Sequence, residues 1–200
     1  YNVEELIKLA KFAGLDIISI TDHDTISALK EAIEIGKFYG IEVIPGLEIS
    51  SDFLDYEIHI LAYFFDIDSK ELEEYLNFFR AERYKRAIRI INKLNSIGHS
   101  ITIDDVLEVA GNSSIGRPHI AKAMVNRNIV SNFYEAFSKY IGNGCIAYER
   151  KVHLSPQSAC KIISDAGGLS FIAHPNNMHE DIIKILIESG IDGIEVVHPS

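Results

Sequence analysis

The sequence predicts an α/β protein in which strands and helices alternate as in a parallel barrel, with a helical subdomain inserted in the middle. Short apolar runs alternate with amphipathic helices, and glycines mark the turns, in residues 1–68 and again in residues 148–200. Between them, residues 69–147 carry apolar side chains at intervals of three and four. We therefore assign 1–68 and 148–200 to the barrel and 69–147 to an inserted helical subdomain.

The composition narrows the possible functions. The chain has 200 residues and a net charge of -10, which argues against an extended surface for duplex nucleic acid. It contains no long apolar segment of membrane-spanning length, and its N-terminus lacks the features of a signal peptide. Cys145 and Cys160 show no metal-binding or redox spacing. A cytoplasmic protein is expected.

The first barrel segment is expected to begin with a helix and to continue with alternating strands and helices. Apolar spacing predicts a helix up to Gly14, a strand over 17–20 and a second helix over 26–39. Further strands are expected over 41–44, 47–50 and 58–64, with Pro45-Gly46 breaking the first from the second. Because a barrel does not open with a helix, we expect a strand before Tyr1.

The inserted segment is predicted to be entirely helical. One or two long helices are expected over 69–97, with Ser69 as a plausible N-cap, followed by helices over 102–110, 115–126 and 132–141. Thr102 and Asp105 have the spacing of a capping box.

The alternating pattern resumes at Ser155-Pro156, where a cap and a proline predict the start of a helix that runs to Ala166. A strand over 169–173, a helix over 179–189 and a strand over 193–197 follow. The chain stops just past this last strand, so we interpret it as a fragment of a longer protein.

Histidines and acids recur on the predicted strands or just after them. These residues are Asp22, His23, Asp24, Glu48, His59, His174 and His198. In a parallel barrel the carboxyl ends of the strands converge on one rim. Imidazole and carboxylate together suit Zn, Mn or Fe better than Ca, and a carboxylate can bridge two ions that share a hydroxide nucleophile.

Each of these residues also has a structural interpretation. Asp22 or Asp24 could cap the following helix, and His59 could be a satisfied core histidine. Glu48 could pair with a lysine. His174-Pro175 could be nothing more than the end of a strand. For His198 a role as a loop residue is preferred. A single shared metal site explains this set of residues better than separate structural roles do.

The motifs resemble those of the PHP (polymerase and histidinol phosphatase) superfamily of metal-dependent phosphoesterases. The matching segments are Ile20-Thr21-Asp22-His23-Asp24-Thr25, Ile44-Pro45-Gly46-Leu47-Glu48-Ile49, Ile58-His59-Ile60-Leu61 and Ala173-His174-Pro175. The resemblance implies a distorted seven-stranded βα barrel, truncated here at both ends, with two or three Mn, Fe or Zn ions. It implies His23, Glu48, His59 and His174 as metal ligands, with Glu48 as the bridge. The family's His-x-His pair is expected before Tyr1 and its Asp-x-His pair after Ser200.

The inserted segment is similar to the subgroup of this superfamily that acts on nucleotides. Arg80, Arg83 and Arg86 recur at intervals of three on one helix, and Gly116-Arg117-Pro118-His119 follows. Arginine forks grip phosphate oxygens. The resemblance implies phosphate contacts for Arg83, Arg117 and His119, and less firmly for Arg86, whereas Arg80 is expected on a solvated face. His99, His153 and His179 are expected at the surface or at helix ends.

The predicted function is hydrolysis of phosphate esters of nucleotides, of the 3′,5′-bisphosphate phosphatase or 5′-to-3′ exoribonuclease type. The nucleophile is expected to be a metal-bound hydroxide, and the substrate a small nucleotide or a short RNA. Two alternatives stay open: a non-catalytic module that binds metal or nucleotide, and a histidinol-phosphate phosphatase.

Overall fold

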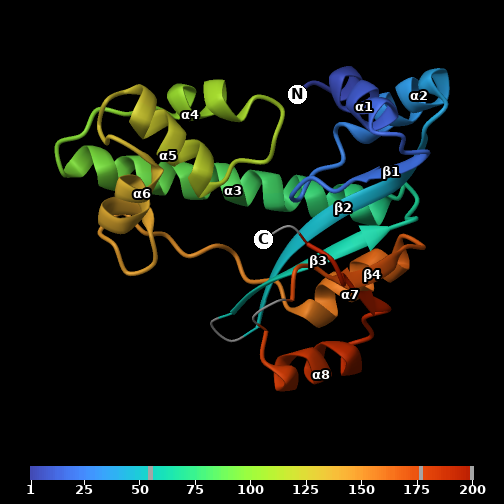
Figure 1. Cartoon of the computed structure of the whole chain (residues 1–200). Coiled ribbons are helices and arrows are strands. Elements are labelled where there is room, and N and C mark those ends of the chain that lie inside the picture. The colour runs from blue at the N-terminus through green and yellow to red at the C-terminus, as the bar shows by residue number, and fades with distance from the viewer. Residues whose placement is uncertain (54–55, 176–177, 199–200) are drawn as a thin grey trace. The chain divides into compact units, whose positions relative to one another are not determined.

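The structure, a computed structural model, describes residues 1–53, 56–175 and 178–198 (Figure 1). It divides into two compact units, one formed by Tyr1–Leu76 with His153–Ser200 and the other by Asn77–Val152. The first division falls inside a long helix, α3 (Lys70–Ser96), and the second falls just before α7 (Pro156–Asp165). The apolar spacing predicts these divisions before residue 69 and after residue 147.

The first unit contains a mixed sheet, which corrects the expectation of uniformly parallel strands. Among the described residues the strand order is β1 (Ile17–Ile20), β2 (Glu42–Phe53), β3 (Tyr56–Tyr63), β4 (Leu169–Ile172) and β5 (Gly193–Ile194). The β1–β2 and β4–β5 pairs are parallel, whereas β2–β3 and β3–β4 are antiparallel. The sheet is not closed in this part of the chain, so the α/β class is observed and a barrel is not.

The predicted break at Pro45-Gly46 is wrong, because β2 runs through both residues. Up to Pro45 the strand pairs with β1, and from Gly46 onward it pairs with β3. Proline lacks the N–H that would continue the ladder, and its carbonyl accepts the N–H of Phe64 at 3.1 Å. The two residues therefore mark a change of partner strand and not the end of a strand.

Gly46 allows β1 to approach this point closely. A Cβ atom at Gly46 would meet the carbonyl oxygen of Ile20 at 2.8 Å and would also strike the Ser19 hydroxyl. The first of these is a backbone atom, which cannot rotate away. Strand β1 therefore reaches its position beside β2 only with glycine here.

The G46A variant is expected to lose about 3 kcal/mol of unfolding free energy, because the strands must separate to admit the methyl group. The matched variant is G14A, since Gly14 has a φ of +77° but open space around its Cβ position. It is expected to lose only about 1 kcal/mol, from backbone strain. Urea unfolding measures both, and equal losses would contradict the steric explanation.

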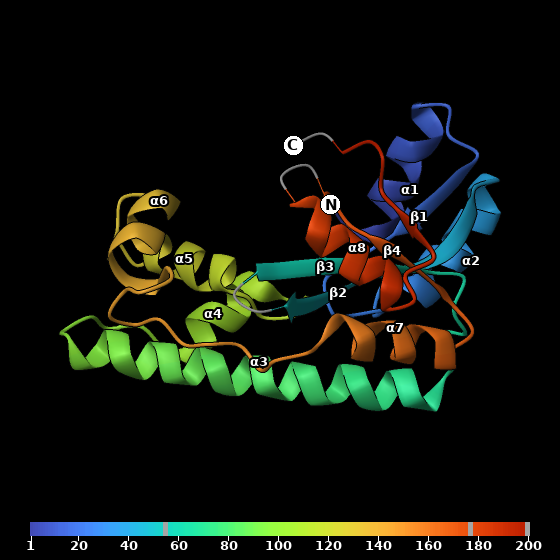
Figure 2. The ribbon, with the colours of Figure 1, turned by 90° about the horizontal axis from the view of Figure 1, so that it is seen from below.

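Among the described residues, the helices that lie wholly in the first unit are α1 (Val3–Phe12), α2 (Leu29–Tyr39), α7 and α8 (Glu180–Glu188). The start of α1 is a capping box between Asn2 and Glu5, and α2 ends at Gly40 in the left-handed conformation. Helices α1 and α2 lie side by side near β1 (Figure 1). Helix α7, capped by Ser155 as predicted, packs on β2, β3 and β4 (Figure 2).

The second unit is helical, as the apolar spacing predicted. Besides most of α3 it contains α4 (Ile103–Ala110), α5 (Arg117–Asn126), α6 (Phe133–Ala136) and the π-helix η1 (Phe137–Ile141). Its core includes Leu94, Ile101, Val106, Ile120, Met124 and Ile141. The predicted Thr102–Asp105 capping box is present. No helix in the described part of the chain is long and apolar enough to cross a membrane.

Candidate functional site

The segment after β1 is attached to β2 at Glu48. The N–H of Glu48 donates to the carbonyl of Asp22 at 3.1 Å, and the N–H of Asp24 donates to the carbonyl of Glu48 at 3.0 Å. His23 and Glu48 thereby form an isolated parallel bridge. The backbone itself holds the His23 side chain beside that of Glu48.

Asp24 stabilises this attachment and does not cap the next helix. Its side chain is 1% exposed, and Oδ1 accepts the N–H of Ser50 at 3.0 Å. Its φ of 49° is left-handed, which aspartate tolerates better than most residues. The N-cap residue of α2 is Ala28. The helix-cap interpretation of Asp22 and Asp24 is therefore wrong.

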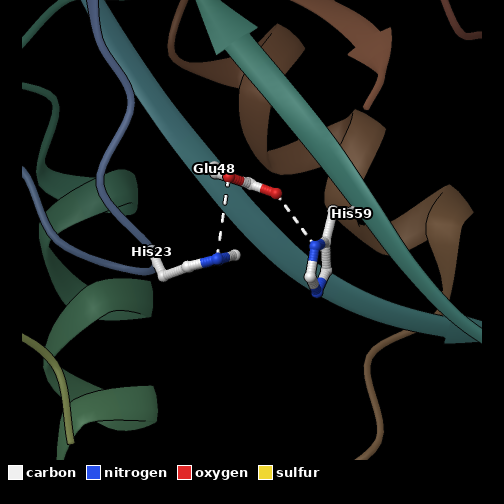
Figure 3. A group of neighbouring side chains, drawn as sticks. All are labelled: His23, Glu48 and His59. Carbon is white, nitrogen blue, oxygen red and sulfur yellow. Dashed lines mark ion pairs between the residues drawn. The ribbon is translucent and has the colours of Figure 1, made fainter. Parts of the chain in front are cut away.

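Glu48 lies between two histidines (Figure 3). Oε1 is 2.9 Å from Nδ1 of His59, and Oε2 is 3.7 Å from Nε2 of His23. One ligand atom from each of the three residues lies within 4.8 Å of the others. His59 also contacts a second carboxylate, with Nε2 at 3.7 Å from Oε1 of Glu57.

His174 brings a third imidazole to Glu48. Its Nε2 lies 2.9 Å from Nδ1 of His59 and 3.3 Å from Oε1 of Glu48. The residue follows β4 in a left-handed conformation, with a φ of 32°, and its N–H donates to Oε2 of Glu195 at 2.7 Å. The structure thus brings together all four residues that the resemblance implied as ligands: His23, Glu48, His59 and His174.

Two further residues at this place were missed or set aside. Glu195 was assigned to the interior of a strand over 193–197, but β5 ends at Ile194, so Glu195 also follows a strand end. His198 was preferred as a loop residue, yet its ring centroid lies 5.4 Å from that of His174. A strand predicted to end at residue 194 would have placed Glu195 with the other polar residues that follow strand ends.

The pKa values of Glu48 and His59 reflect competing effects of burial and of their charged neighbours. Burial alone would lower the pKa of His59, but its hydrogen bonds to Glu48 and Glu57 outweigh burial and raise the pKa to about 9. Burial alone would raise the pKa of Glu48, but the hydrogen bond from His59 and the charge of His23 leave it below its ordinary value. Glu48 and His59 form an ion pair in the metal-free protein.

The donor atoms have separations that suit a divalent ion. Ligands about 2.0–2.1 Å from a tetrahedral ion lie about 3.3 Å from each other. Oε1 of Glu48, Nδ1 of His59 and Nε2 of His174 are 2.9–3.3 Å apart. The other oxygen of Glu48 faces His23, as a bridging carboxylate requires. Imidazole and carboxylate ligands suit Zn, Mn or Fe.

In the second unit, Arg83 and His119 lie around the start of α5. Nη1 of Arg83 donates to the carbonyl of Ile115 at 3.2 Å. The N–H of Gly116 donates to Nδ1 of His119 at 3.0 Å, which leaves the proton of the neutral ring on Nε2. Burial and the charge of Arg83 lower the pKa of His119. At neutral pH His119 is therefore an uncharged donor through Nε2.

Arg86 and Arg117 make contacts within the second unit. Nε of Arg86 donates to the carbonyl of Glu149 at 2.9 Å. Nη1 of Arg117 donates to Oδ1 of Asn143 at 2.8 Å, and its guanidinium lies over the rings of Phe137 and Tyr148. These contacts stabilise the helical unit, a role that the sequence spacing did not indicate.

Comparison with curated proteins finds relatives along almost the whole chain. The chain is 33% identical to the 5′-3′ exoribonuclease of Haemophilus influenzae, over 96% of this chain and 72% of that protein. It is 29% identical to the 3′,5′-nucleoside bisphosphate phosphatase of Chromobacterium violaceum, over 98% and 71%. It is 25% identical to the phosphoribosyl 1,2-cyclic phosphate 1,2-diphosphodiesterase of Eggerthella lenta, over 98% and 77%.

Solved structures agree with these relatives. A crystal structure from Bifidobacterium adolescentis, of a protein assigned as a metal-dependent phosphoesterase, matches with a TM-score of 0.86 and 29% identity, over 97% of this chain and 71% of that one. No family model matches the chain. The relatives, the fold and the motifs around Glu48 lead to one conclusion: the chain belongs to the PHP superfamily of metal-dependent phosphoesterases.

Proposed function

We propose that this protein hydrolyses phosphate esters of nucleotides at a multinuclear metal site held by His23, Glu48, His59 and His174. The observation that carries the proposal is the cluster itself, in which both oxygens of one carboxylate face imidazole nitrogens. Two or three ions of Mn, Fe or Zn are proposed, in a cytoplasmic enzyme. The seven-stranded barrel implied by the resemblance stays a prediction.

Each part of the cluster has a separate task. Divalent ions bound here would neutralise phosphoryl oxygens and make a water molecule more acidic. Glu48 holds its two oxygens toward opposite sides, and the bridge between His23 and Glu48 fixes the first strand end against the second. Glu195, which accepts the N–H of His174, restrains the backbone of that residue and so the position of its ring.

The substrate phosphate is proposed to contact Arg83 and His119. Both present donors near the start of α5, where Arg83 is positively charged and Nε2 of His119 carries a proton. Arg117 and Arg86 are also predicted to contact the phosphate, but less directly, because the hydrogen bonds described above occupy part of each guanidinium.

The direct test is phosphate release by the purified protein with added Mn²⁺. Adenosine 3′,5′-bisphosphate and a short 5′-phosphorylated RNA are the substrates, because relatives are named for activity on nucleoside bisphosphates and RNA. Turnover of either supports the proposal. Metal binding without turnover of both substrates would favour a non-catalytic module, and turnover of histidinol phosphate alone would favour the other alternative.

Metal binding is expected to release a proton from His59. Because the pKa of His59 is about 9 in the metal-free protein, its ring is protonated at pH 7.5 and must lose this proton to become a ligand. Apparent affinity for Mn²⁺ should therefore rise with pH up to that value, by as much as about tenfold per pH unit. Calorimetric titrations in two buffers of different ionisation enthalpy count the released protons. The H59N variant should release fewer, and equal numbers would contradict the prediction.

A further inference from the structure

Asp52 and His153 form a pair that the proposed metal site does not use. Oδ2 of Asp52 makes a short contact with Nδ1 of His153, although the two residues are 101 positions apart. Asp52 is 8% exposed, whereas the His153 side chain is 61% exposed. The pair therefore consists of a buried carboxylate behind an exposed imidazole.

The segment that leads into α7 is attached to β2 without help from the His153 imidazole. The N–H of Asp52 donates to the carbonyl of Leu154 at 2.9 Å, and the N–H of Leu154 donates to Oδ1 of Asp52 at 3.3 Å. These two bonds already connect β2 to the segment that leads into α7. The contact with Oδ2 has a different effect: it occupies Nδ1 and directs Nε2 away from the carboxylate.

The pair lies on the face of the sheet that carries Glu48. Side chains alternate along a strand, so Glu48, Ser50 and Asp52 share one face of β2, with Asp52 about 13 Å from Glu48 along the strand. Asp52 is directly opposite Glu57 on β3, and Glu57 contacts His59. Glu57 therefore lies between the two groups: it is opposite Asp52 on the neighbouring strand and contacts the metal-site residue His59.

We propose that His153, positioned by Asp52, binds a second phosphate group of the substrate, distinct from the one that is cleaved. The inference rests on the proposed function. The Asp52 carboxylate holds Nδ1 of His153 and so fixes the orientation of the ring, which leaves Nε2 to contact a phosphate oxygen. The second group is the other phosphate of a nucleoside bisphosphate or the next phosphodiester of an RNA chain.

The test compares substrates that differ in one phosphate. The H153Q variant should raise KM for adenosine 3′,5′-bisphosphate about tenfold, the effect of losing one hydrogen bond to a charged phosphate, and leave kcat unchanged. KM for the adenosine 3′- and 5′-monophosphates should change less than about twofold. D52N, which no longer offers a carboxylate to Nδ1, should give the same pattern more weakly. H179Q alters another exposed histidine paired with an aspartate and should change nothing.

The outcomes separate this inference from the function on which it rests. If the wild type turns over none of these substrates or the RNA, both fall. If the wild type is active and H153Q leaves KM for the bisphosphate unchanged, only the second-phosphate contact falls. An equal change with all three adenosine nucleotides also overturns it, because His153 would then act on the cleaved phosphate or on the fold. H153Q is an exposed substitution, and an unchanged melting temperature excludes unfolding.

Discussion

The E48Q variant is expected to lose about 10³-fold in kcat/KM, which corresponds to about 4 kcal/mol of transition-state stabilisation. Glutamine has nearly the shape of glutamate, but it offers one neutral oxygen where Glu48 offers two charged ones. Nδ1 of His59 and Nε2 of His174, 2.9 and 3.3 Å from Oε1, would keep their places but lose the anion that they share. Metal content of the purified variant, measured by mass spectrometry, should fall together with activity.

The control for this variant is E42Q on the same strand. Glu42 is exposed at the start of β2 and pairs with Ile17, away from the cluster. The E42Q variant removes the same charge and should keep both its metal content and its activity. If E48Q also kept its metal content and its rate, the cluster around Glu48 would not be the catalytic centre, whatever the similarity to phosphoesterases.

The candidate site could be predicted from sequence because its residues obey a local rule. His23 and His174 follow apolar runs at strand ends, whereas Glu48 lies inside β2 between the buried residues Leu47 and Ile49. The runs before Glu48 and His174 are bounded by glycine and proline, and the run before His23 lies between Asp16 and Thr21. The same local signals predicted α1, α2, α4 and α7 with small errors at their ends.

The pairing of the strands could not be predicted in this way. Whether β3 runs parallel or antiparallel to β2 depends on the connection between them, and the periodicity of an apolar run is the same in both cases. Pro45-Gly46 was misinterpreted for a related reason. Proline in a strand signals a missing ladder bond, but only the structure shows that β2 changes its partner there from β1 to β3.

Contacts between distant parts of the chain were also hidden. The sequence pattern does not single out Asp52, and His153 is expected at the surface or at a helix end, so neither residue indicates the other. The motif predicts that Arg117 contacts phosphate, whereas its guanidinium also lies over two aromatic rings, 5.6 and 5.7 Å from their centroids. The spacing of residues predicts which side chains lie together on one helix or strand. Contacts between separate helices and strands are seen only in the structure.

The R83Q variant is expected to lower kcat/KM for nucleotide substrates by about 10–100-fold, mainly through KM, because a charged donor to the phosphate is removed. The change should also be visible without substrate. Burial and the charge of Arg83 lower the pKa of His119, so removing the charge should bring that pKa back toward its ordinary value. NMR titration of the His119 ring measures this shift directly.

Arg80 supplies the matched variant, since it lies one turn earlier on α3 and is exposed. R80Q removes an equal charge from the same helix and is expected to leave KM within about twofold and the pKa of His119 nearly unchanged. A rise in the pKa of His119 in R83Q with normal kinetics would mean that Arg83 faces His119 but not the substrate. In the proposed site Arg83 would have two effects. Together with burial it lowers the pKa of His119, and it would place a positive charge beside the Nε2 donor of His119 near the start of α5.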